Sequence, residues 1–120
     1  MAGKINIEND NLVFTLTGVD KVLALKSKLV VPLKHVKSVS TAKADWNYFK
    51  MLKVAGTRIP ELVVDGRFLS KEGLLFYEMH DPDMCITVEL ENEKYKKVVF
   101  EVSDKETTAI MIQEALDRLQ

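Results

Sequence analysis

Helical spacing is sustained in only one long stretch of this sequence, residues 103–119. Ser103 and Glu106 stand three residues apart in the pattern of a capping box, which predicts that a helix begins there. Five apolar residues then share one stripe at helical spacing: Ala109, Ile112, Ala115, Leu116 and Leu119. A helix this short is marginal alone, so the stripe must pack on the rest of the chain. That requirement favours a bent sheet whose open end is closed by one terminal helix.

Short apolar runs separated by turn residues fill the remaining sequence. The runs predict strands at 4–9, 11–17, 29–31, 36–41, 61–69, 74–79, 86–90 and 97–102. Asp65 and Gly66 predict a hairpin turn inside the run at 61–69. Parallel strands need long crossover connections, usually helices, and the sequence between the runs predicts none. We therefore expect about seven antiparallel strands in a small barrel or an orthogonal sandwich, capped by the helix, forming a single domain over residues 1–120.

The apolar alternation dissolves between residues 43 and 59, a connection whose length is unusual in a small domain. Aromatic and basic side chains gather there, and they define the candidate binding site: Lys43, Trp46, Tyr48, Lys50, Lys53, Arg58 and Arg67. Aromatic rings among cations can stack a planar ligand, enter a membrane interface or anchor a peptide. The alternative is that Trp46 and Phe49 fold back and close the end of the barrel opposite the helix.

Charged residues are divided unevenly along the chain. Residues 1–58 hold ten Lys and Arg against four Asp and Glu, a balance of +6. Residues 59–120 hold seven against fourteen, a balance of −7, and the sum is the net charge of −1. This asymmetry indicates an anionic partner, unless the two halves interleave in one barrel and their fields cancel. The pI of about 6.1 argues against nucleic acid as that partner.

Motifs for catalysis, metal binding or a cofactor are missing from the sequence. It has no phosphate-binding glycine loop and no nucleophile elbow, so we expect no enzyme, no cofactor and no small-molecule substrate. His35 and His80 have no partner at metal-ligand spacing, and we expect both to be solvated. The single cysteine, Cys85, excludes an internal disulfide, and its phase against Ile86 and Val88 places it on the outer face of a strand.

Three segments of the sequence resemble bacterial pleckstrin-homology-like domains. Residues 31–39 read VPLKHVKSV, an apolar-Pro-Leu segment of the kind those domains carry. Residues 56–60 (GTRIP), followed by 66–68 (GRF) and Gly73, and the pair of runs at 88–90 and 95–102 are similar to a small uncharacterised branch of that group. The resemblance implies a seven-stranded bent barrel closed by a C-terminal helix.

Pleckstrin-homology folds serve lipid binding, peptide binding and self-association, so the resemblance leaves several functions open. The tip of the first predicted hairpin, residues 8–11, is acidic and neutral, unlike the basic tip of members that bind phosphoinositides. We therefore expect a cytoplasmic, non-enzymatic module that binds a protein or forms a homo-oligomer, with Ile110 and Met111 as candidate self-association residues. The alternative is a peripheral binder of anionic lipid surfaces that uses the basic region 43–58.

Overall fold

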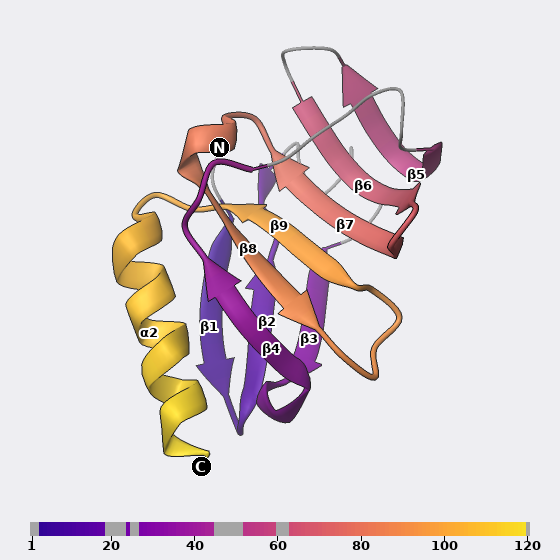
Figure 1. Ribbon diagram of the computed structural model, residues 1–120. Coiled ribbons are helices and arrows are strands. Elements are labelled where there is room, and N and C mark those ends of the chain that lie inside the picture. Colours follow the sequence, from indigo (N-terminus) through magenta and orange to yellow (C-terminus); the bar gives the residue numbers. More distant parts are fainter. Residues whose placement is uncertain (1–2, 19–23, 25–26, 45–51, 60–62, 120) are drawn as a thin grey trace.

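The computed structural model describes residues 3–18, 24, 27–44, 52–59 and 63–119, and of residues 52–55, 58, 59 and 63 only the backbone. These residues form two β-sheets and a C-terminal helix (Figure 1). The expected mostly-β class with a terminal helix is thus confirmed. No helix among the described residues is long and apolar enough to cross a membrane.

The first sheet has three antiparallel strands in the order β1 (Lys4–Glu8), β2 (Asn11–Thr15) and β3 (Lys28–Pro32). Glu8 pairs with Asn11, so the first hairpin turns on only two residues, Asn9 and Asp10. Their φ angles of 50° and 63° lie in the left-handed region, which Asn and Asp tolerate better than other non-glycine residues. The predicted first hairpin is therefore confirmed.

The second sheet has six strands in the order β4-β8-β9-β7-β6-β5. Their bounds are β4 (Val36–Ser40), β5 (Leu52–Ile59), β6 (Val63–Ser70), β7 (Gly73–Met79), β8 (Cys85–Leu90) and β9 (Lys97–Glu101). Short 3-10 turns precede β4 (η1, Leu33–His35) and β8 (η2, Pro82–Met84).

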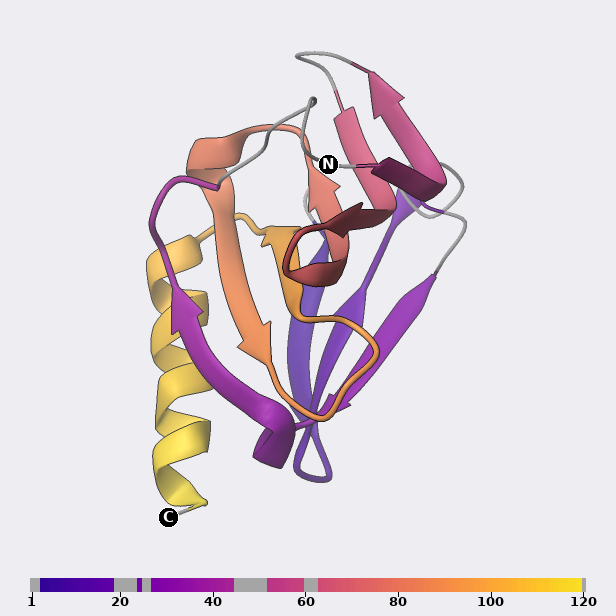
Figure 2. The ribbon, with the colours of Figure 1, turned by 45° about the vertical axis from the view of Figure 1, so that its right-hand side comes forward.

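One pair in the six-stranded sheet is parallel, so the predicted purely antiparallel arrangement is wrong. β8 does not pair with β7, and β9 lies between them: it is antiparallel to β8 and parallel to β7. The connection from β7 to β8 passes the position of β9 through the short turn η2 and contains no long helix. Among the described residues there are nine strands in two sheets instead of about seven in one closed barrel (Figures 1 and 2).

Asp65 and Gly66 do not form a turn, contrary to the prediction, but lie in the middle of β6. Gly66 pairs with Gly56 of β5, and their φ angles are +126° and +125°. A Cβ atom built on Gly56 would lie 2.2 Å from the carbonyl oxygen of Asp65, so the two backbones approach too closely for a side chain. The Asp-Gly pair therefore marks a close strand contact here, not a hairpin.

The six-stranded sheet is apolar on both faces. The main cluster, between this sheet, the three-stranded sheet and the helix, contains Phe14, Phe76, Val88, Phe100 and Ile112, all 0% exposed. The second cluster lies on the opposite face and includes Phe68, Leu75, Tyr77 and Val99. Strand β7 contributes to both clusters in alternation, as the apolar run at 74–79 predicts.

The C-terminal helix α2 (Lys105–Arg118) begins one residue later than the capping box predicts. Its N-cap is Asp104, not Ser103, because the Asp104 carboxylate accepts hydrogen bonds from both the backbone amide (3.1 Å) and the hydroxyl (2.9 Å) of Thr107. The stripe at Ile112, Ala115 and Leu116 is buried as expected. Leu119, just beyond the helix, is 46% exposed, so the stripe ends before it.

Candidate functional site

Much of the predicted basic and aromatic site lies where the structure gives no side-chain information. Trp46, Tyr48 and Lys50 are outside the described residues. Lys53 and Arg58 belong to β5, of which only the backbone is described at these positions. Whether region 43–58 binds anionic lipid therefore stays a prediction.

The two remaining members of that site, Lys43 and Arg67, are not brought together. Exposed Lys43 lines a hollow with Tyr77, which belongs to the second cluster. Arg67 precedes Phe68, another member of that cluster, and successive strand residues point to opposite faces of a sheet. Lys43 and Arg67 therefore lie over opposite faces of the six-stranded sheet and cannot contact one small ligand together.

The predicted self-association residues occupy different environments. Ile110 is 59% exposed on α2, whereas Met111 is partly buried against the main cluster. Val13 and Val99 are buried, with 3% and 2% of their surface exposed, so neither can extend an exposed apolar patch around Ile110.

A groove runs beside the end of α2, and we call it the terminal groove. It consists of two hollows, of about 390 and 260 Å³, that share Lys34 and Leu119. The first hollow extends to the turn between β1 and β2, and the second extends along η1 and the start of β4. Apolar side chains from four elements line it: Pro32, Leu33, Val36, Leu116 and Leu119. The exposed side of Leu119 thus forms a wall of a groove.

The rim of the terminal groove is basic along one side. Lys34 and Lys37 are exposed, and neither forms an ion pair with another described residue. Asp10, with Asn9 and Asn11, lies at the far end of the first hollow. Among the described residues that line the groove, the charged side chains are Asp10, Lys34 and Lys37, and the rest of the lining is apolar or amide.

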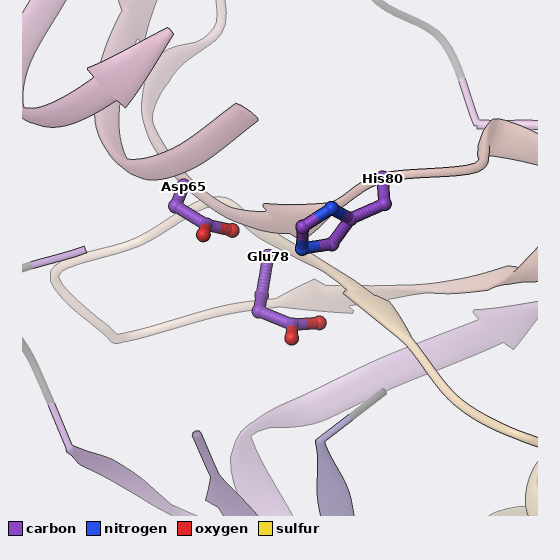
Figure 3. Close-up of side chains that lie close together, drawn as sticks. All are labelled: Asp65, Glu78 and His80. Carbon is purple, nitrogen blue, oxygen red and sulfur yellow. The ribbon is translucent and has the colours of Figure 1, made fainter. Parts of the chain in front are cut away.

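A second group of functional side chains lies away from the groove, where β7 ends. Asp65 of β6 and Glu78 of β7 are directly paired across the two strands, and both are 0% exposed. His80 follows β7 and is half-buried. Ligand atoms from the three side chains lie within 4.8 Å of one another, and Figure 3 shows them grouped together. We call this group the carboxylate–imidazole cluster.

The sequence alone does not indicate this cluster, because Asp65 and Gly66 predict a turn and His80 is expected to be solvated. One signal could have indicated it. Glu78 is the only charged residue in the run at 74–79, which was expected to pack on both faces, so its carboxylate had to be buried. The strand register that places Asp65 opposite Glu78 cannot be read from spacing alone.

Cys85 lies near this cluster and is 0% exposed, so its predicted place on an outer face is wrong. Its thiol donates to the carbonyl oxygen of Asp81 at 3.4 Å. Burial, and then the carboxylates of Glu101, Glu78 and Asp81, raise the pKa of the Cys85 thiol. The thiol therefore stays protonated and is a poor nucleophile.

Comparison with known proteins finds no matching family model, no matching curated protein and no matching solved structure. The resemblance of residues 31–39 to pleckstrin-homology-like domains therefore stays a prediction.

Proposed function

We propose that the chain is a non-enzymatic interaction module of pleckstrin-homology-like type that binds a segment of a partner protein in the terminal groove. The observation that carries this proposal is the pair of adjoining hollows that share Leu119 and Lys34. The resemblance to that family rests on the motifs in residues 31–39, 56–60, 66–68 with Gly73, 88–90 and 95–102. A mostly-β chain with a C-terminal helix is compatible with it.

The partner segment is defined by the chemistry of the groove. Six residues line the first hollow and seven line the second, far fewer than the roughly 20–30 residues that each partner contributes to a protein interface. The groove therefore suits one or two anchor side chains. Leu119 and its apolar neighbours favour a large apolar side chain as the anchor. The charges of Lys34 and Lys37 favour an acidic side chain next to that anchor, because opposite charges across an interface select the partner and its register. The occupant is therefore a short peptide with one apolar and at least one acidic residue.

The test selects peptides from a random displayed library on the full chain and measures their affinity by calorimetry. We expect selected peptides to carry an apolar residue beside Asp or Glu. Leu119→Glu and Lys34→Glu should each weaken binding by about tenfold or more. The controls Leu69→Glu and Lys71→Glu introduce the same charge at exposed positions outside the groove and should leave affinity within about twofold.

Two results would contradict the proposal. If peptides bind the two groove variants as tightly as they bind the two control variants, the binding surface lies elsewhere on the chain. If no peptide is selected and sedimentation shows a dimer that Leu119→Glu dissociates, the groove is filled by a second copy of the chain, as in self-association.

A further inference from the structure

Strand β3 forms one edge of the three-stranded sheet (Figure 1). It pairs with β2 on one side, and no described strand pairs with its other side. Along the strand, Leu29 and Val31 are buried, whereas Lys28 and Val30 are exposed. A free edge offers backbone N–H and C=O groups to which another extended chain can bind. The register with β2 determines which groups β3 offers.

Two hydrogen bonds at the ends of the β2–β3 ladder define its pattern. The amide of Leu16 donates to the carbonyl oxygen of Ser27 at 3.0 Å, and the amide of Leu33 donates to that of Asp10 at 2.9 Å. Both bonds continue the register of the ladder between them. Because bonded and non-bonded pairs alternate in an antiparallel ladder, the odd-numbered residues of β3 bond to the even-numbered residues of β2. The even-numbered residues of β3 therefore face the free edge.

Three residues of β3 have outward backbone groups, and they are Lys28, Val30 and Pro32. The first two each offer an N–H and a C=O group, whereas Pro32 offers only its carbonyl oxygen because proline has no N–H. Proline occurs in sheets where its missing N–H would not pair with a neighbouring strand, so Pro32 agrees with the outward assignment. Pro32 also lines the first hollow of the terminal groove. The free edge of β3 therefore begins at the groove.

We propose that the peptide bound in the terminal groove continues along β3 as a fourth strand of the three-stranded sheet, an inference that rests on the proposed function. Two residues with complete outward groups are too few to hold a strand by themselves, because even a whole two-stranded hairpin is only marginally stable in water. The terminal groove supplies the second anchor. Hydrogen bonds to Lys28 and Val30 then bind the backbone of the peptide and do not depend on its sequence.

The exposed side chains of β3 define what the added strand carries. Val30 is 50% exposed and pairs with the buried Val13 of β2, so an apolar side chain next to Val30 extends this apolar row. The charge of Lys28 favours a second acidic residue in the peptide. The β3 strand of a second copy is a poorer occupant, because it has one lysine and no acidic residue and would add positive charge to a basic edge.

A series of N-methylated peptides tests the added strand without any change to the protein. The tightest peptide selected on the full chain is methylated at one backbone nitrogen at a time, and its affinity is measured by calorimetry. Successive N–H groups of a strand point to opposite sides. Methylation should therefore weaken binding by about tenfold or more at alternate positions along the part that lies on β3, and by less than about twofold at the positions between them.

Hydrogen exchange measured by NMR identifies the strand of the protein that pairs. When the peptide binds, the amides of Lys28 and Val30 should exchange more slowly by about tenfold or more. The amides of Ile5 and Ile7 are the control, and their exchange should stay within about twofold. They face outward at the opposite edge of the same sheet, because the odd-numbered residues of β2 bond to the even-numbered residues of β1.

A pair of variants at one position separates the backbone group from the side chain. Val30→Pro removes an outward N–H at an edge position where proline is tolerated, and it should weaken peptide binding by about tenfold. Val30→Ala keeps the N–H and should weaken binding by no more than about threefold. If Val30→Pro does not fold, the methylated peptides and hydrogen exchange still decide the question.

The outcomes distinguish this inference from the proposed function. If methylation has no alternating effect and the Lys28 and Val30 amides stay unprotected, the added strand is overturned, while groove binding stands if Leu119→Glu still weakens it. Lys28 and Pro32 would then only protect the edge against aggregation. Protection of the same amides without peptide, increasing with protein concentration, would mean that a second copy covers β3 and would also overturn the inference. Failure to select any peptide would overturn both proposals.

Discussion

At the scale of single residues, the start of α2 depends on Asp104. Its carboxylate binds the amide and the hydroxyl of Thr107, and these two bonds, the amide first, hold the pKa of Asp104 below its ordinary value. Asp104, and not the Ser103 that the sequence pattern indicates, is the cap, because its carboxylate satisfies the Thr107 amide. Because the cap is only one residue from the expected position, the helix still presents the expected residues, such as Ile112, to the core.

Asp104→Ala should lower the melting temperature by a few degrees, whereas Ser103→Ala should leave it nearly unchanged. The effect depends on pH with a defined sign. Because the folded pKa of Asp104 is depressed, its stabilisation is fully present above the ordinary aspartate pKa of about 4 and is lost as pH falls through the folded value. Thermal unfolding at a series of acidic pH values should therefore show the wild type and Asp104→Ala converging. A larger effect of Ser103→Ala would contradict the assignment of the cap.

At the scale of secondary-structure elements, α2 is held by one buried stripe. Ile112 is 0% exposed in the main cluster, and Ile110, on the same helix, is 59% exposed. Ile112→Ala should therefore reduce the free energy of unfolding by about 2–5 kcal/mol. Ile110→Ala, a chemically identical change at an exposed site, should alter it by no more than about 0.5 kcal/mol. Denaturant titration measures both values, and equal losses would mean that α2 presents a different face to the core.

Strands β5 and β6 meet at a pair of glycines that leaves no room for a side chain. Gly56→Ala would force an unfavourable φ of about +125° and a collision with the Asp65 carbonyl, so we expect a loss of about 2–4 kcal/mol in unfolding free energy. Gly18→Ala is the control, since Gly18 has a φ of +56° but no atom within 4 Å of an added Cβ. It should cost roughly 1 kcal/mol, through the backbone angle alone. Similar losses for both variants in chemical denaturation would rule out the close contact between β5 and β6.

The elements that could be predicted from sequence are those that local chemistry determines. Turn residues predict the turn at Asn9 and Asp10, and periodicity predicts the strand around Val88 and the terminal helix. The order of the strands does not. Nothing in β7 or β9 indicates that they pair in parallel, because that pairing depends on which apolar faces meet in the folded chain.

The two candidate sites were missed for the same physical reason. The Asp65–Glu78 pair exists only because β6 and β7 are in one particular register. The terminal groove forms where α2, η1 and the first hairpin meet, from segments that are far apart in the sequence. Predicted members of the basic site, such as Lys43 and Arg67, instead fall on opposite faces of a sheet whose existence their spacing could not indicate.

At the scale of the whole molecule, the two candidate sites lie at opposite ends. Figure 1 shows β7 pointing away from the end of the molecule that carries the C-terminus. His80 follows β7, whereas Leu119 of the terminal groove is next to the C-terminal residue. Substitutions at distant sites usually add in free energy, so changes in the carboxylate–imidazole cluster and changes in the terminal groove should act independently.

The double variant Lys34→Glu/His80→Gln should therefore lose the sum of the unfolding free energies that the two single variants lose, to within about 0.5 kcal/mol. Denaturant titration of the wild type, the two single variants and the double variant measures this sum. A deviation of more than about 1 kcal/mol would contradict the independence of the two ends of the molecule.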